Sequence, residues 1–369
     1  MASNPQLEQA IESNPDDKTA YSVYADWLQS QGDPRGELVA LSLAGGDTTA
    51  AQAKVLGPLA EYAKTFDGND GDTFTWKNGF IDSAFLSHNT YSKPQGDLTK
   101  GLQLLLDHPA ARFLRELRFA FNNDPNEDNC QSLIDVLAAQ PRPTIKSLFF
   151  GDIKYAGAAR DEDQGEDTEI SWYSVGNLSE LWKSVPNLEK LIVTSGSAES
   201  AMAGGTQLGE LNLPKLKHLE FRTGGLEKSN FDAIVASQTP ALEHLDVWIG
   251  REDYGCSVGT DEIANLVSRQ DIPKLKHLGI MNCEFVDEIV GLLTESTLVR
   301  GLRELDLSLG CLTDDGVEQL TSDDLAWSLD KLDVSRNLLT DASALDGVAK
   351  TVIADDQRDA DSHYAAVGE

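Results

Sequence analysis

The sequence predicts an α/β protein, a solenoid of stacked repeats with a parallel sheet on its concave face and helices on its convex face, preceded by a small helical unit. Three observations predict this fold class. An apolar motif recurs along most of the chain, its copies are regularly spaced, and helical patterns fill segments between copies. One strand and its return helix cannot bury an apolar face alone, so the copies are expected to stack and share a core.

The recurring motif has the form L-x-x-L-x-L, with other apolar residues replacing some leucines. Its second and third apolar positions are two residues apart, so both side chains point to the same side of a short strand. The eight copies begin 26 to 43 residues apart, at Leu114, Ile145, Leu188, Leu216, Leu242, Leu275, Leu302 and Leu329. Helical apolar spacing in 231–235, 261–267 and 313–320 supplies the return path.

The motif and its spacing resemble the leucine-rich-repeat family, in the ribonuclease-inhibitor-like subclass, over residues 114–354. In that family the eighth position after the motif start holds Asn or Cys, whose side chain bonds the backbone of the turning loop. Asn122, Cys283 and Asn337 match this pattern, whereas four copies have Gly. The resemblance implies a solenoid and a structural role for Cys283. It implies no activity, because the same scaffold serves many partners.

Residues 1–45 are predicted to form the small helical unit. The segments 14–17, 24–28 and 32–38 resemble the repeat-companion domain, a bacterial module found beside leucine-rich repeats. Residues 21–23 differ from the family's usual sequence at this place. The resemblance implies no chemistry for this chain.

Two aromatic residues of this unit, Tyr24 and Trp27, are expected to be core anchors. Four charged residues are expected to cap helices and form salt bridges, or alternatively to form a docking surface: Asp26, Asp33, Arg35 and Glu37.

The remaining boundaries follow from the motif. Residues 46–113 are predicted to form a helix and an N-terminal capping region, and 355–369 are predicted to be a polar, frayed tail. The acidic run 160–167 interrupts the period and is interpreted as an exposed loop. A calcium loop is the alternative, but the spacing matches no EF-hand.

The net charge of the chain restricts the classes of molecule that it can bind. Asp and Glu total 61 against 30 Lys and Arg, giving a formal net charge of −31. Nucleic acid and anionic membranes are therefore poor partners, since most of the surface would repel them. The acidity reflects either a salty environment or a basic partner protein, and the sequence leaves both open.

We expect a cytoplasmic protein. The first residues have no basic segment followed by an apolar one, and no apolar run reaches the roughly 18 to 20 residues that span a bilayer. The cysteines stand at 130, 256, 283 and 311 without a C-x-x-C pair, so a zinc site of the usual spacing is not expected.

The candidate binding face consists of residues that flank the central Leu of each motif copy, because these should point away from the core. His218, His244 and His277 precede the central Leu in three consecutive copies. Strands lie about 5 Å apart, so the three rings should stack in a row. The row is interpreted either as a tolerated exposed pattern or as a metal site or pH-sensitive contact. A straight row converges poorly on one ion, which favours the first interpretation.

Positions on the other side of the central Leu complete this face. Trp248 is predicted to be an exposed interface anchor beside Arg222 and Met281. The full set of expected partner-binding residues is Arg222, Trp248, Met281, His218, His244, His277, Glu220, Asp246 and Asp306.

Enzyme motifs are missing from the sequence. It contains no G-x-S-x-G, no phosphate-binding loop and no H-E-x-x-H, so we predict no catalytic residue, no metal ligand and no cofactor. The leading prediction is a non-catalytic protein–protein interaction module that binds its partner on the concave face. The alternatives are an acidic inhibitor or immunity-type protein for a basic enzyme, and a metal-binding protein or enzyme that uses the histidines. The sequence favours no oligomeric state and no particular partner.

Overall fold

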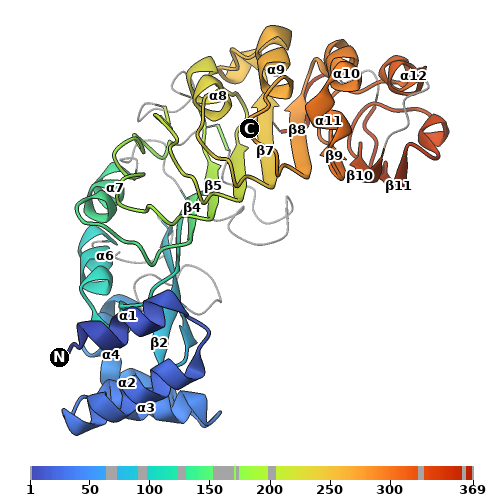
Figure 1. The fold of residues 1–369 in the computed structure, drawn as a ribbon. Helices are drawn as coiled ribbons and strands as arrows, with labels where there is room; N and C mark the ends of the chain where they lie inside the picture. Colours follow the sequence, from blue (N-terminus) through green and yellow to red (C-terminus); the bar gives the residue numbers. More distant parts are fainter. Residues whose placement is uncertain are drawn as a thin grey trace. The chain divides into compact units, whose positions relative to one another are not determined.

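The computed structural model describes residues 2–63, 73–89, 98–122, 130–152, 170–171, 174–197, 205–322, 328–359 and 363–367. Within these residues, eleven strands lie in a sheet in the order in which they occur in the chain. The pairing is antiparallel between the first two strands and parallel in the later pairs whose register is defined. The protein is therefore an α/β protein with a mostly parallel sheet (Figure 1).

The chain divides into two compact units. The first comprises Met1–Asn122 with Arg142–Leu148, and the second comprises Asn123–Pro141 with Phe149–Glu369. None of the helices in the described part of the chain is both long and apolar enough to cross a membrane.

Helices begin the first unit, as predicted for residues 1–45. They are α1 (Pro5–Ser13), α2 (Lys18–Ser30), α3 (Pro34–Leu43), α4 (Thr49–Leu56) and α5 (Leu59–Ala63). The side chains of Asn4, Asp17 and Asp33 accept hydrogen bonds from first-turn backbone N–H groups of α1, α2 and α3. Such caps satisfy donors that have no partner within the helix.

An aromatic core holds these helices together. Tyr24 is fully buried and stacks on Trp27 and on Phe80, with ring centroids 5.9 and 6.0 Å apart. Trp27 packs against the same cluster while partly buried. Both expected core anchors are thus in the core.

Two of the four charged residues of this unit form a buried ion pair. Arg35 lies 2.8 Å from Asp33, and both side chains are almost fully buried. Asp33 also accepts from the Ala2 N–H, and Arg35 donates to the Pro109 carbonyl. The capping and salt-bridge interpretation is confirmed for Asp33 and Arg35.

A hairpin follows the helices, where the sequence predicts the start of strand structure. Strand β1 (Phe74–Lys77) pairs antiparallel with β2 (Phe80–Asn89), which pairs parallel with β3 (Glu116–Asn122). Helix α6 (Leu98–Leu106) lies between β2 and β3 in the chain. Asn78 and Gly79 turn the hairpin with positive φ, and a Cβ at Gly79 would lie 2.6 Å from the Cα of Val39. Only glycine fits this close approach.

Most of the later strands belong to the second unit. They are β4 (Ser147–Asp152), which begins in the first unit, β5 (Lys190–Thr194), β6 (His218–Arg222), β7 (His244–Gly250), β8 (His277–Cys283), β9 (Glu304–Asp306), β10 (Leu329–Asp333) and β11 (Ala349–Ile353). The central leucines of the motif are paired in register from β5 to β10, as Leu191, Leu219, Leu245, Leu278, Leu305 and Leu332. All six are buried. The predicted strands and their inward face are therefore confirmed.

Helices also return the chain between strands of this unit. They are α7 (Gln131–Ala138), α8 (Lys228–Val235), α9 (Thr260–Val267), α10 (Val286–Glu295), α11 (Thr297–Arg300) and α12 (Asp314–Ser322). Helices α8, α9, α10 and α12 lie side by side along one side of the strands (Figure 1). The helices predicted in 231–235, 261–267 and 313–320 are confirmed. The acidic run 160–167 lies outside the described residues.

Asn337, at the eighth position after the start of its motif copy, bonds the neighbouring backbone as predicted. Asn337 is buried, accepts from the Leu312 N–H and donates to the Leu307 carbonyl. Gly250 has φ of 77°, and a Cβ there would lie 1.9 Å from the Gly224 carbonyl oxygen. Glycine is required here because a side chain would collide with the neighbouring turn.

The end of the chain differs from the prediction of a frayed tail. Val367 donates to and accepts from the side-chain amide of Asn282, at 2.8 and 2.6 Å. The Ala366 N–H donates to the Leu309 carbonyl, and Ala365 is buried. The prediction was wrong for 365–367, because the backbone N–H groups of these three residues are hydrogen-bonded to Glu284, Leu309 and Asn282.

Candidate functional site

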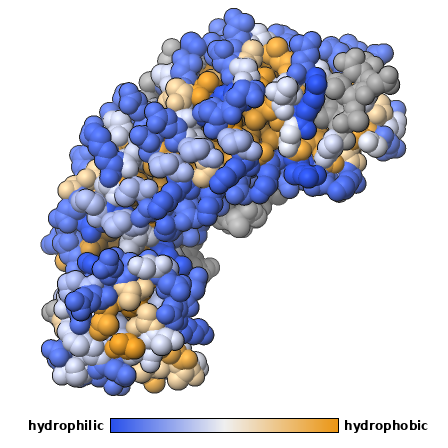
Figure 2. All heavy atoms as spheres, viewed as in Figure 1, coloured by the Kyte–Doolittle hydropathy of each residue, from blue (hydrophilic) through white to orange (hydrophobic). Residues whose placement is uncertain are grey.

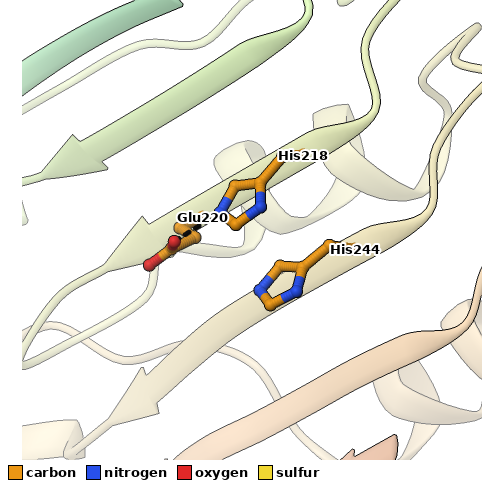
Figure 3. Close-up of side chains that lie close together, drawn as sticks. All are labelled: His218, Glu220 and His244. Atoms are coloured by element: carbon orange, nitrogen blue, oxygen red, sulfur yellow. Dashed lines mark hydrogen bonds and ion pairs between the residues drawn. The ribbon is translucent and has the colours of Figure 1, made fainter. Parts of the chain in front are cut away.

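Three histidines begin three neighbouring strands and form the histidine row, defined as His218, His244 and His277. They are paired in register on β6, β7 and β8. Their rings stack nearly parallel, with centroids 4.0 and 3.9 Å apart and interplanar angles of 5° and 6°. Figure 3 shows the first two rings side by side on adjacent strands. The predicted stacking is confirmed.

Carboxylates lie beside these rings. Glu220 and Asp246 follow His218 and His244 by two residues, so they share the same sheet face. Glu220 is hydrogen-bonded to His218 Nε2 (Figure 3). Asp246 Oδ1 lies 2.7 Å from His277 Nε2, and its Oδ2 lies 3.2 Å from His244 Nε2. Asp246 therefore contacts the Nε2 atoms of two rings that belong to different strands.

The two contacts of Asp246 are different in kind. The contact with His277 is a hydrogen bond. His244 Nε2 is buried and close to the other oxygen, but it lacks the alignment of a hydrogen bond. The second nitrogen of His277, Nδ1, is bonded to Glu304 at 3.0 Å. Both ring nitrogens of His277 are thus hydrogen-bonded, whereas Nε2 of His244 is not.

Gly279 makes the position of Asp246 possible. It is the register partner of Asp246 on β8. A Cβ at Gly279 would lie 2.2 Å from Asp246 Oδ1. Since real side chains do not approach so closely, only glycine leaves room for the carboxylate to reach His277.

The contacts perturb the acid–base behaviour of the cluster. Burial alone would raise the pKa of Glu220, but the hydrogen bond from His218 and the charge of Arg222 lower it to about 2. Burial likewise opposes ionisation of Asp246, but His244 and His277 hold its pKa well below the usual range. Burial lowers the pKa of His218 despite its bond to Glu220. The pKa of His277 is raised, because Asp246 and Glu304 outweigh its burial.

Trp248 and Met281 do not form an exposed anchor. They are register partners, as the sequence predicts, but both are fully buried. Arg222 is also buried, and its guanidinium bonds to Glu220. The prediction of an exposed Trp was wrong because strand alternation identifies the face on which a side chain lies and not whether that face is covered there.

The remaining predicted residues differ in exposure. Glu220, Asp246 and Asp306 are buried, whereas the side chains of His218 and His244 keep 25% and 26% of their surface exposed. Of the nine predicted residues, the structure brings His218, Glu220, Arg222, His244, Asp246 and His277 into one connected set of contacts.

The sequence analysis missed two members of the site. Glu304 begins β9 at the position that the histidines hold on β6 to β8, so its register was a usable signal. Gly279 stands where the neighbouring copies have a carboxylate, and this substitution was the signal for it.

A row of exposed charges runs beside the histidines, one residue earlier in each strand segment. This charged row consists of Glu189, Lys217, Glu243, Lys276, Arg303 and Asp330. Lys217 lies 2.6 Å from Glu189, and Lys276 lies 3.0 Å from Glu243. These pairs are solvent-exposed, so each contributes little to stability. The face in view in Figure 2 is mostly hydrophilic.

A separate groove of about 810 Å³ lies between residues 205–212 and α8. Its lining includes Gln207, Glu210, Glu227 and Asp232. The lining contains no histidine or cysteine, so the histidine row is the better candidate site.

Comparisons with known proteins agree with the fold. No family model matches the chain, and no curated protein matches it. A crystal structure of a protein from Bacteroides fragilis is similar, with 26% sequence identity and a TM-score of 0.62. The match covers 73% of this chain and 73% of that one. That protein is described by its source and not by an activity, so the similarity supports the architecture alone.

Proposed function

We propose that residues 114–354 form a leucine-rich-repeat solenoid and that the protein is a non-catalytic binding protein whose sheet face holds a partner protein. The in-register leucines and the bonds of Asn337 support the repeat assignment. The three capped helices α1 to α3 support the proposal that residues 1–45 are a repeat-companion domain.

One observation carries the binding function: the stacked rings of His218 and His244, each about a quarter exposed, lie next to the charged row at the start of neighbouring parallel strands. Stacked repeats commonly present such surfaces to partners. His218, His244 and the charged row, which includes the carboxylates of Glu189 and Glu243, are the proposed contact residues. Trp248 and Met281 are fully buried and are not among the proposed contacts.

A non-catalytic role fits the hydrogen bonding of the row. Among the described residues, no Ser, Thr or Cys side chain is hydrogen-bonded to any of the three rings. An imidazole that activates a nucleophile would need such a neighbour. The net charge of −31 makes a basic protein the better partner, including a basic enzyme that this chain would cover as an inhibitor.

Affinity capture tests the proposal. The full-length protein is immobilised and exposed to native lysate at low and high salt, beside a His218→Ala/His244→Ala double variant. Lys183→Ala serves as the control, because Lys183 forms only an exposed pair with Glu180. We expect the wild type and the control to retain the same protein, less of it at high salt because the attraction is screened. Equal retention by the double variant would contradict the proposed surface.

A further inference from the structure

We propose that His244, Asp246 and His277 form a binding site for one divalent transition-metal ion of the zinc class. This site goes beyond the proposed function, because the partner surface does not require a metal.

The donor set is two imidazoles and one carboxylate. The three ligand atoms all lie within 4.8 Å of one another. Zinc binds imidazole nitrogen and carboxylate oxygen at about 2.0–2.2 Å, so two ligands of one ion lie about 3 to 4 Å apart. Asp246 is already 2.7 and 3.2 Å from the two Nε2 atoms. Two histidines and one carboxylate also leave coordination positions open.

Glu304 supplies the support that metal-binding histidines usually have. It bonds Nδ1 of His277 at 3.0 Å, which leaves Nε2 directed at Asp246. A ligating histidine commonly gives its other N–H to a carboxylate, which fixes the orientation of the ring and strengthens it as a ligand.

The other histidine has a nitrogen in need of a partner. His244 Nε2 is buried and is not hydrogen-bonded within the described part of the chain. A buried polar atom without a hydrogen bond is unfavourable. A cation between this nitrogen and Asp246 would satisfy both.

Gly279 keeps the site open. Because a Cβ there would lie 2.2 Å from Asp246 Oδ1, glycine permits the carboxylate to reach the Nε2 atoms of both rings. The sequence argued against a metal site, because three rings in a straight row converge poorly on one ion. Asp246 removes that objection, since it supplies a third ligand atom beside two of the rings.

Metal binding requires one rearrangement. The rings of His244 and His277 are stacked, so their in-plane lone pairs run side by side. The rings must turn toward Asp246 about their Cβ–Cγ bonds, and the proton between His277 and Asp246 must leave when the metal enters. His244 is free enough to turn, since about a quarter of its side chain is exposed.

A second, overlapping triad of His218, Glu220 and His244 is the less suitable one. Both oxygens of Glu220 are engaged, one by His218 and the other by Arg222. The guanidinium places a positive charge next to the position of the ion, which opposes cation binding. His218 therefore serves as a matched control, because it stacks on His244 without belonging to the proposed site.

Calorimetric titration of the metal-stripped full-length protein with Zn²⁺ tests the site. We expect one ion per chain for the wild type. Asp246→Asn and His277→Gln should each weaken binding by about 100-fold or more, and Glu304→Gln by about 10- to 100-fold. Gly279→Ala should also weaken it, whereas His218→Ala should retain binding within about 10-fold of the wild type.

Three results would overturn the proposal: no stoichiometric binding to the wild type, retained binding in both Asp246→Asn and His277→Gln, or equal loss in His218→Ala. Thermal melting of each metal-free variant checks folding, and Glu304→Gln, which alters a half-exposed group, remains decisive if a buried change impairs folding. These measurements use purified protein without a partner, so their failure is separate from failure of the capture experiment.

Discussion

Two regions of the molecule bury charged side chains, and they do so differently. In the first unit, Asp33 and Arg35 bond to each other and to the backbone of Ala2 and Pro109. In the histidine row, the rings bond to titratable side chains, and His244 Nε2 is left without a hydrogen bond among the described residues. In the first unit, backbone groups complete the ion pair and fix it within the fold. In the histidine row, the partners of the rings are carboxylates, which can bind a ligand instead.

The largest loss of stability should follow substitution of Trp248, and its size distinguishes a buried side chain from an exposed one. Because Trp248 is fully buried, Trp248→Ala should lower the free energy of unfolding of the second unit by about 3–5 kcal/mol. Urea unfolding followed by circular dichroism measures this loss. An exposed anchor would instead leave stability within about 0.5 kcal/mol.

Arg35→Ala should be similarly costly in the first unit. It leaves Asp33 buried with its main charged partner removed, and breaking a buried pair costs about 3–5 kcal/mol. Hydrogen exchange of the α1–α3 amides reports the stability of this unit locally. Lys54→Ala is the control, because its pair with Glu37 is exposed and should contribute about 1 kcal/mol at most. Equal protection in both variants would show that the ion pair does not hold the unit together.

Acid should affect the first unit through two carboxylates. Burial alone would raise the pKa of Glu8 and of Asp33, but their hydrogen bonds lower both. A carboxyl with a lowered folded-state pKa stabilises the fold above its unfolded pKa of about 4, and this stabilisation is lost as the pH falls through the folded value. Protection of α1–α3 should therefore decrease below about pH 4. Glu8→Gln should show a shallower decrease, and an unchanged slope would contradict this origin.

The smallest effect should follow loss of the His218 ring, which is about a quarter exposed. His218→Ala removes one stacking contact and one hydrogen bond, so the second unit should lose about 1 kcal/mol or less. Chemical denaturation measures the difference from the wild type. A loss of several kcal/mol would contradict this expectation and would show that the histidine row stabilises the fold as the Asp33–Arg35 pair does.

Much of this architecture could be predicted from the sequence because it depends on local periodicity. The spacing of Leu219, Leu245 and Leu278 identified the strands and their inward face. The same register predicted the stacked histidines. Asp33 was one of four charged residues expected to cap helices or form salt bridges, and it caps α3.

The rest depends on contacts between residues distant in sequence. Alternation placed Trp248 on the sheet face but could not show that it is covered. Val367 bonds to Asn282 across 85 residues, which no local pattern indicates. The contact of Asp246 with two rings depends on the missing side chain of Gly279 on the next strand. Such contacts are properties of the assembled sheet.

The most direct test of the histidine row as a ligand site is an NMR titration of the six histidines of the full-length protein with one equivalent of Zn²⁺. We predict that the ring signals of His244 and His277 shift and lose the marks of mutual stacking, while those of the partly buried His108 in the first unit stay in place. Unchanged signals for His244 and His277, or equal shifts for all six histidines, would contradict the account.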